Sequence, residues 1–272
     1  MRNILIVITI IFTSIVNAQI NAKTYYENLP DGSIIMYADN NEICPVSIEI
    51  NLKLENLKSS KGNNKVFVIP ANTKAHKITT LTRIKQKGKA NVSSSNWNNY
   101  GIHQAKDYKR DFVYILPFEK DTSYKLSQGY NGTLSHQNEN ALDFSMPVGT
   151  DIAAVRDGIV VKVIDKNNRG CPKSDCQKFN NVILVYHNDG TFAEYVHLKQ
   201  NGAKVKVGDT IKQGQIIGES GNTGWSTAPH LHLVIFVQNV KSRTTLKTKF
   251  KVDDGKQPKF LIEGETYARH YD

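Results

Sequence analysis

Cysteine is rare in this sequence, with three residues in 272. Two of them end the segment Cys171-Pro-Lys-Ser-Asp-Cys176, where a disulfide would close a short loop and two free thiols are the alternative. A zinc knuckle would need two further ligands nearby, and none is visible beside them. Cys44 is left over, and we expect it to be buried.

Long apolar runs are missing except at the start of the chain. Residues 1–18 combine Arg2, an apolar stretch from Ile4 to Val16 and the small-residue ending Val16-Asn17-Ala18, which is typical of a secretory signal peptide. The run is shorter than the ~20 residues of a membrane span. No cysteine follows it that could carry a lipid. We therefore expect cleavage near Gln19 and export into an oxidising compartment, without stable membrane insertion.

Blocks of like charge are also missing. The chain has 35 basic and 25 acidic residues, and without Arg2 the balance is 34 against 25, or +9. The lysines are scattered, with no block of five or more, so the charge favours anionic surfaces such as cell-wall polymers and does not predict nucleic-acid binding. A hydrophobic content of 39% argues against disorder of the whole chain.

Helical periodicity is missing between residues 125 and 240, where strand patterns alternate with turn residues. Asp151–Val155 is predicted to pair with Ile159–Ile164 across Arg156-Asp-Gly158. Val182–Tyr186 is predicted to pair with Phe192–Val196 across His187-Asn-Asp-Gly-Thr191. Both connections contain Asp-Gly, a strong hairpin signal, so we expect an all-β, antiparallel architecture.

The first hundred residues after the predicted signal peptide look β-like but irregular. Short apolar runs at Ser47–Leu54, Val66–Pro70 and Phe112–Leu116 are separated by turn-rich segments, which suggests a small β-sandwich-like domain without visible chemistry. The predicted organisation is a signal peptide at 1–18, a β-rich domain at 19–120, a main domain at 121–240 and a C-terminal extension at 241–272.

Two histidines stand one residue apart in Pro229-His-Leu-His-Leu233. In a strand, His230 and His232 would share one face while Leu231 and Leu233 pack on the other. A catalytic zinc site needs about three protein ligands and an open position for water. Candidate partners upstream are His136 and Asp143, and His197 in Tyr195-Val-His-Leu198.

Seven short motifs occur in a set order around these residues. They are Asp143-Phe-Ser-Met-Pro-Val-Gly-Thr150, Arg156-Asp-Gly158, Tyr195-Val-His-Leu198, Val207-Gly-Asp209, Gly214-Gln215, Gly221-Asn-Thr-Gly224 and Pro229-His-Leu-His232. Together they resemble the LytM/lysostaphin-type zinc metallopeptidases, which cut peptide bonds in bacterial cell-wall peptidoglycan. The resemblance covers about residues 128–236, and it implies an antiparallel β-sheet metallopeptidase domain at 121–240.

The resemblance also implies roles for five residues. His136, Asp143 and His232 would bind one Zn²⁺ ion. His230 and His197 would assist catalysis, one by moving a proton from water to the leaving amine and the other by stabilising the oxyanion. The sequence does not assign which histidine has which role.

The spacing between His136 and Asp143 departs from the commonest family pattern, which has three intervening residues. Here six intervene, and Glu139 occupies the position that the shorter spacing would give to the histidine. Either a longer loop lets His136 reach the metal, or Glu139 is the ligand. We expect His136, because imidazole suits zinc and a loop rich in Asn and Gln can absorb three residues.

The predicted function is that of a secreted zinc endopeptidase that hydrolyses peptidoglycan. We expect a monomer in the periplasm or outside the cell, associated with the cell wall, with no nucleic-acid partner. The alternative is a non-catalytic wall-binding or amidase-activator scaffold of the same fold, and the presence of all five residues favours the enzyme. The bond that is cut stays open.

Other polar residues carry weaker expectations. His187 lies beside an Asn-Asp-Gly turn, and we expect it to be exposed. Gly221-Asn-Thr-Gly224 lacks the following lysine and helix of a phosphate-binding loop, so we expect a turn that lines the groove. Trp225 and Tyr130 are predicted either to flank that groove or to pack in the core.

Overall fold

The computed structural model describes residues 20–272, so the predicted signal peptide lies outside the described residues. Within that range the chain forms 23 strands and one 3₁₀ helix. All strand pairings are antiparallel except those of two pairs of two-residue strands. The prediction of an antiparallel all-β fold is confirmed. No helix in residues 20–272 has the length and apolarity needed to cross a membrane.

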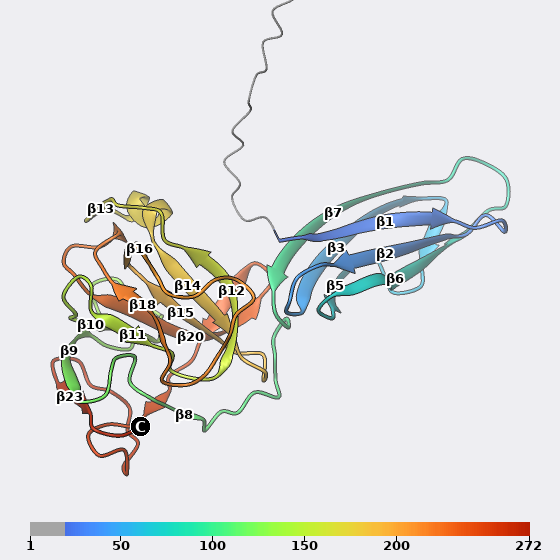
Figure 1. The fold of residues 1–272 in the computed structure, drawn as a ribbon. Coiled ribbons are helices and arrows are strands. Elements are labelled where there is room, and N and C mark those ends of the chain that lie inside the picture. The colour runs from blue at the N-terminus through green and yellow to red at the C-terminus, as the bar shows by residue number, and fades with distance from the viewer. Residues whose placement is uncertain (1–19) are drawn as a thin grey trace, which may run out of the picture.

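Residues 20–100 form two sheets, drawn in blue to green in Figure 1. Their strands are β1 (Ala22–Asn28), β2 (Ile34–Asn40), β3 (Val46–Glu55), β4 (Leu57–Ser59), β5 (Asn64–Ile69), β6 (Thr73–Arg83) and β7 (Asn91–Tyr100). One sheet has the order β1-β2-β6-β4 and the other β5-β3-β7.

The two N-terminal sheets share one hydrophobic cluster. Strand β3 alternates apolar and polar residues, so Ile48 and Ile50 point inward. They belong to the same cluster as Met36 from β2 and Leu81 from β6. The two sheets are therefore held together by a common core, while an independent domain at 19–120 stays a prediction.

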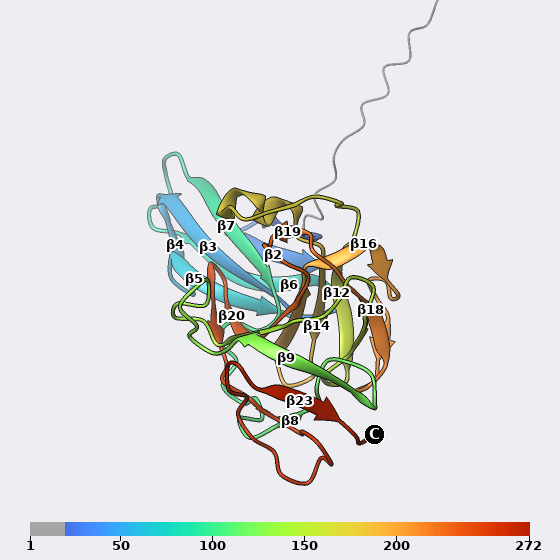
Figure 2. The same ribbon diagram turned by 90° about the vertical axis from the view of Figure 1, so that its left-hand side faces the viewer.

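The rest of the chain is built around a nine-stranded sheet. Its strands follow the order β17-β12-β14-β15-β20-β10-β9-β23, and β21 also pairs with β20. The elements are β8 (Val113–Tyr114), β9 (Thr122–Gln128), β10 (Ala141–Phe144), β11 (Asp151–Ala153), β12 (Gly158–Ile164), β13 (Gly170–Cys171), η1 (Ser174–Phe179), β14 (Val182–Tyr186), β15 (Phe192–Val196), β16 (Leu198–Ala203), β17 (Thr210–Ile211), β18 (Ile216–Ser220), β19 (Gly224–Trp225), β20 (Leu231–Asn239), β21 (Ser242–Thr245), β22 (Lys249–Phe250) and β23 (Thr266–Arg269). Figure 2 shows β23 beside β9, close to the C-terminus.

The two faces of β20 have different surroundings. Leu231, Leu233 and Ile235 are buried in the main hydrophobic cluster on one face. On the other face Val234 and Phe236 belong to a smaller cluster that includes Cys44 from the N-terminal part. Because His230 and His232 share the face of Val234, the N-terminal part packs against the same face that carries the histidines, farther along the strand.

One predicted hairpin is confirmed and the other is wrong. Strands β14 and β15 pair with Tyr186 opposite Phe192 across the expected turn. Strand β11 pairs with β18, and β12 pairs with β14 and β17, so Asp151–Val155 and Ile159–Ile164 are not partners. The connection between them turns a corner between two sheets, and the buried Arg156 within it is held by the Asp189 carboxylate 2.8 Å away.

The main core extends beyond the predicted boundaries of residues 121–240. Tyr114, Leu116 and Phe118 are buried in it on the N-terminal side, and Phe250 and Tyr267 on the C-terminal side. Strand β8 also pairs in parallel with β22. The segments on both sides of the predicted main domain thus share its core.

The cysteines follow the expectation from their spacing. Cys171 and Cys176 form a disulfide that closes the short loop containing part of η1. Cys44 is a free, buried thiol.

Candidate metal centre

Strand pairing brings Asp143 and His232 together. Asp143 on β10 lies directly opposite His232 on β20 in the antiparallel register. Directly opposite side chains in such a pair lie on the same face and touch. The Nδ1 atom of His232 is 2.8 Å from Oδ1 of Asp143.

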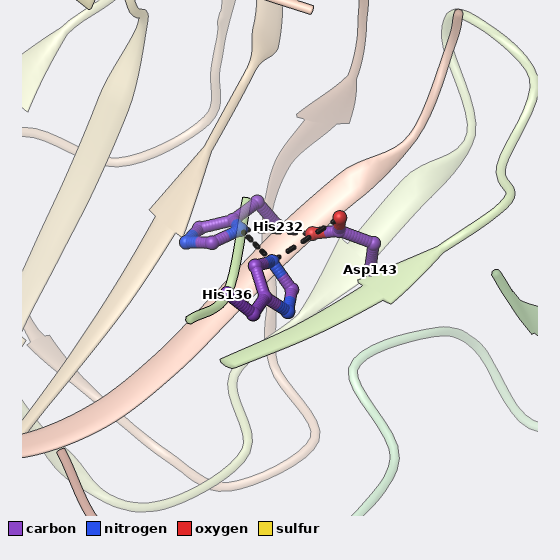
Figure 3. Close-up of side chains that lie close together, drawn as sticks. All are labelled: His136, Asp143 and His232. Carbon is purple, nitrogen blue, oxygen red and sulfur yellow. Dashed lines mark hydrogen bonds and ion pairs between the residues drawn. The ribbon is translucent and has the colours of Figure 1, made fainter. Parts of the chain in front are cut away.

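His136 reaches the same point from outside the strands. It lies in the turn-rich segment between β9 and β10 and is fully buried. Its Nε2 atom is 3.2 Å from Oδ2 of Asp143 and 3.2 Å from Nδ1 of His232. Figure 3 shows the three side chains pointing toward one another, with His136 coming from a different segment than the strands of Asp143 and His232.

The three donor atoms fit a tetrahedral zinc site. Zinc binds histidine nitrogen and carboxylate oxygen at about 2.0–2.2 Å, which places neighbouring ligand atoms of a tetrahedron about 3.3 Å apart. The observed separations of 2.8 to 3.2 Å are close to that edge length. Two neutral imidazoles and one carboxylate also leave a fourth position free, as catalytic zinc sites do.

Further hydrogen bonds orient the candidate ligands. The Nδ1 atom of His136 lies 3.0 Å from the backbone oxygen of Gly129, so donation there leaves Nε2 as the atom that would bind a metal. Gln128 donates from Nε2 to Oδ2 of Asp143 at 2.9 Å, and its Oε1 accepts from the backbone of Leu134. Gln128 therefore links the carboxylate to the turn that carries His136.

The carboxylate and His136 shift each other's pKa. Burial alone would raise the pKa of Asp143, but hydrogen bonds from His136 and His232 outweigh it and hold that pKa well below its ordinary value. Burial would lower the pKa of His136, and the bond and charge of Asp143 outweigh it and raise that pKa. Asp143 is therefore ionised at neutral pH and offers a negative charge to a cation.

His197 and His230 lie beside this cluster without joining it. Their ring centroids are 4.5 Å apart, and Nε2 of His230 is 3.8 Å from Oδ1 of Asp143. The Nδ1 atom of His197 faces the backbone oxygen of Thr223 at 2.7 Å, and that of His230 faces the backbone oxygen of Ala228 at 2.8 Å. Donation to these carbonyls fixes both tautomers and leaves each Nε2 with a lone pair.

Burial keeps both of these histidines neutral. It lowers the pKa of His197 to about 3, with further lowering from the charges of His230 and His232. It also lowers the pKa of His230, although the carboxylate of Asp143 opposes the shift. Among residues 20–272 neither Nε2 atom has a hydrogen-bond partner, so each neutral ring can accept a hydrogen bond there.

A groove of about 680 Å³ gives access to the cluster. Asp143, His197, His230 and His232 line it, together with residues from both walls: Gln128, Leu134, Ser135, Gln137, Glu139, Gln177, Asn180, Glu194, Val196, Trp225, Ser226, Thr227 and Arg243. Trp225 flanks the groove, which is one of the two positions predicted for it. Tyr130 does not line the groove, and its hydroxyl donates to the backbone oxygen of Thr248.

His136 and Glu139, the two alternatives for the third candidate ligand, have different surroundings in the structure. Glu139 is not part of the three-residue cluster, because both of its oxygens pair with Nη2 of Arg243 at 3.0 and 3.1 Å. His136 reaches the cluster across the six-residue spacing instead. Sequence reasoning missed Gln128 and Arg243. Nothing in the pattern of either segment indicates these contacts, and the partner of Arg243 lies more than a hundred residues away in the chain.

The expectation for His187 is wrong. Its side chain is fully buried, with Nδ1 2.8 Å from the backbone oxygen of Asp157. Burial lowers its pKa to about 4, the bond to Asp157 opposes that shift, and the charge of Arg156 adds to it. The turn that follows is polar, but His187 comes directly after β14 and faces the corner at Arg156 rather than solvent.

Comparison with known proteins identifies the region that contains the groove. The profile described as "Peptidase family M23" matches residues 137–244. The chain is 38% identical over 126 residues to the glycyl-glycine endopeptidase ALE-1 of Staphylococcus capitis, covering 45% of this chain and 32% of that protein. It is 31% identical over 124 residues to the peptidoglycan DD-endopeptidase ShyA of Vibrio cholerae, covering 43% and 26%.

Among solved structures, the catalytic domain of lysostaphin from Staphylococcus simulans is 33% identical, with 46% of this chain and 87% of that chain covered and a TM-score of 0.34. The chain spans about a third or less of the length of the first curated relatives that it matches. The resemblance to the LytM/lysostaphin family is confirmed for the matched segment, which begins one residue after His136.

Proposed function

From the premise that residues 137–244 form a peptidase family M23 domain, we propose that this protein is a zinc-dependent endopeptidase that hydrolyses peptide bonds in bacterial peptidoglycan. The substrate class comes from relatives whose names describe glycyl-glycine and peptidoglycan DD-endopeptidases. The wall bond that this protein cuts is a separate question, because those two names describe different bonds.

One observation carries the proposal. Side chains from three segments converge so that donor atoms of His136, Asp143 and His232 lie 2.8 to 3.2 Å apart at the floor of an open groove. A purely structural ion pair would not need two imidazole nitrogens gathered at one carboxylate. This arrangement suits a divalent cation, and the nitrogen-rich donor set favours zinc.

Zinc held by these ligands would lower the pKa of a bound water to about 7 and polarise the scissile carbonyl. The protein supplies the proton-transfer groups. Both His197 and His230 present a lone pair at Nε2, and His230 is the less buried, with 16% of its side chain exposed. We assign His230 as the group that accepts the proton of the attacking water and returns it to the leaving amine.

His197 has a different role from His230. Its greater burial makes it the weaker base, since its pKa is about 3. In the neutral tautomer it accepts hydrogen bonds at Nε2 and donates none there, so it orients a proton donor in the groove, and only after protonation could it stabilise an oxyanion. The hydroxyl of Ser226 lies 3.1 Å from Nδ1 of His230 and helps to hold the ring in place.

The groove suits an extended peptide. Polar groups such as Gln177, Asn180 and Thr227 line it together with the apolar Trp225 and Leu134. Leu134 is 81% exposed, so it is available for contact with a bound chain. An excess of basic residues suits a polymer that carries carboxylates and phosphates.

We also propose that the mature chain acts outside the cytoplasm, in the periplasm or at the outer cell wall, as a monomer. The apolar start of the sequence and the Cys171–Cys176 disulfide support an oxidising compartment. The scaffold alternative is disfavoured because a protein that only binds the wall would not need the five residues of the candidate centre to be kept.

The test is hydrolysis of purified peptidoglycan. The mature chain, starting near Gln19, is incubated with sacculi of two wall types, with and without a chelator, and the released fragments are analysed by mass spectrometry. We expect peptide-bond cleavage that stops with chelator and returns with added zinc. Binding to sacculi without any cleaved fragments would support the scaffold alternative and contradict the proposal.

A further inference from the structure

The three candidate ligands differ in how they are held. Asp143 and His232 sit opposite each other in a ladder between two strands of the nine-stranded sheet. His136 lies outside any strand, and its backbone bonds only to its own turn, from its nitrogen to Gly132 and from Glu139 to its oxygen. The position of His136 therefore depends on what fixes that turn.

Apolar packing does little to fix it. Leu134 at the tip of the segment is 81% exposed, and Asn138 has a positive φ of 61°. The N-terminal half of the turn is attached through Gln128, which accepts from the backbone of Leu134 and Ser135 at 3.0 Å each. In the C-terminal half, from residue 137 to 140, the backbone oxygen of Glu139 accepts from the nitrogen of Asn131 at 2.8 Å, which holds the turn to itself, and a further anchor ties it to the sheet.

Strand β21 supplies that anchor. It pairs with β20 from Phe236 onward, just beyond the point where β10 pairs with β20 at Val234. The segment before β10 therefore runs past the start of β21. There Asn140 bonds to β21: its backbone nitrogen donates to Oγ1 of Thr245 at 2.8 Å, and its Nδ2 donates to the backbone oxygen of Thr245 at 3.0 Å.

Arg243 adds the charged part of the anchor. Its Nη2 contacts both oxygens of Glu139 at 3.0 and 3.1 Å, and its Nη1 contacts Oε2 of Glu194 on β15 at 2.6 Å. The guanidinium lies 5.3 Å from the ring of Phe236, and 29% of the side chain is exposed. Arg243 thus ties residue 139 to two neighbouring strands with short, charge-assisted bonds.

We propose that Arg243 is a positioning residue for the metal centre: through Glu139 it holds the turn that carries His136, and so sets the zinc affinity of the site. This inference rests on the proposed zinc site and not on the identity of the substrate. It also gives Glu139 a role in the longer His136–Asp143 spacing, since that residue ties the extra length of loop to the sheet.

The test compares Arg243→Met with a matched variant, Arg156→Met. Arg156 is also an arginine paired with a carboxylate, at 2.8 Å from Asp189, but it is more deeply buried and lies at the other end of β15. Zinc is removed from the full mature chain, and zinc affinity is measured by competition with a chromophoric chelator. Groups that orient metal ligands change affinity by about 10–100-fold when they are replaced.

We expect Arg243→Met to weaken zinc binding about 10–100-fold and Arg156→Met to change it less than threefold, even where Arg156→Met lowers the melting temperature more. Arg243→Lys should restore part of the loss, since lysine keeps the charge but not the planar fork. The visible absorption of the cobalt-substituted chain should change in Arg243→Met and stay unchanged in Arg156→Met.

Zinc affinity of Arg243→Met within threefold of the original chain would overturn the inference, and so would an equal loss in Arg156→Met. Glu139→Gln weakens the same Arg243–Glu139 contact by changing the carboxylate instead of the arginine. It provides the test if Arg243→Met does not fold. A chain that binds zinc but leaves peptidoglycan uncut contradicts the proposed function alone, and the affinity comparison then still decides the role of Arg243.

Discussion

Two buried polar clusters lie at opposite ends of strand β15, about 13 Å apart by the rise of its five residues. At one end are His136, Asp143 and His232. At the other, Arg156 pairs with Asp189 and lies over the ring of Phe112 at 3.9 Å, next to His187. Both ends therefore contain a histidine that is fully buried and a carboxylate that is ionised.

The two clusters differ in where their positive charge comes from. The cluster of Arg156, Asp189 and His187, here called the far cluster, contains its own cation. This is the guanidinium of Arg156, so the carboxylate of Asp189 is neutralised within the protein. The cluster of His136, Asp143 and His232, here called the near cluster, has one carboxylate and two imidazoles whose ring nitrogens gather around it, and it opens into a groove. Burial of a histidine is thus no sign of a metal site, whereas convergent donor atoms without a resident arginine or lysine are.

The largest expected effect is loss of a ligand. His232→Ala should reduce peptidoglycan hydrolysis at least about 10³-fold, because a metal contributes several kcal/mol to the stabilisation of the transition state. Zinc content per chain, measured by elemental analysis, should fall in parallel. His187→Asn is the matched control at the far cluster and should keep its zinc, so equal zinc loss in both variants would remove the distinction between the clusters.

His230→Ala should separate chemistry from metal binding within the near cluster. We expect hydrolysis to fall about 10²–10⁴-fold, as for the loss of a general base, while zinc affinity stays close to that of the original chain. His230 is not one of the three convergent donors. Fragment release that survives this substitution would contradict the assignment of His230, and His197→Ala would then be the variant to measure.

Breaking the far cluster should affect stability and not activity. Asp189→Ala leaves the buried Arg156 without its carboxylate, and removal of one partner of a buried pair costs about 3–5 kcal/mol. Chemical unfolding should report this loss in the free energy of unfolding. Hydrolysis by the fraction that remains folded should be unchanged, and a selective loss of hydrolysis would show that the far cluster also serves the groove.

The pH dependence of stability gives the smallest expected effect. The pKa of His187 is about 4 in the folded protein and 6.5 at its ordinary value, so between these limits the unfolded chain binds more protons. The stabilisation from keeping His187 neutral is thus complete above about pH 6.5 and is lost as the pH falls to about 4, which amounts to about 3 kcal/mol.

His187→Asn isolates this contribution, because asparagine can keep a donor toward Asp157 without titrating. The free energy of unfolding should fall less steeply from pH 7 to pH 4.5 in the variant than in the original chain. Parallel pH profiles would mean that His187 is not held neutral by burial.

Much of the fold could be predicted because it depends on local patterns. Alternation along Leu231–Ile235 determines which side chains share a face, and the Asp-Gly turn after His187 predicts the β14–β15 hairpin, which is confirmed. The same turn signal failed at Arg156-Asp-Gly158. There Arg156 binds Asp189 from another turn, and that distant contact decides the direction of the chain.

The candidate site could be predicted in part. The sequence names the histidines and Asp143, and the structure brings His136, Asp143 and His232 together with His197 and His230 beside them. The supporting residues Gln128 and Arg243 could not be predicted, since each acts through a contact set by strand register and packing. No spacing in the sequence encodes such a contact.

The sequence by itself determined that His230 and His232 lie on one face of a strand, because side chains alternate with a period of two whatever surrounds them. It also provided the residue types that a zinc site needs. Only the tertiary structure decided that His136 reaches the centre while Glu139 pairs with Arg243, and that His187 is buried at the far end. Those outcomes depend on which distant segments pack together, and the free energy of that packing is a property of the whole fold.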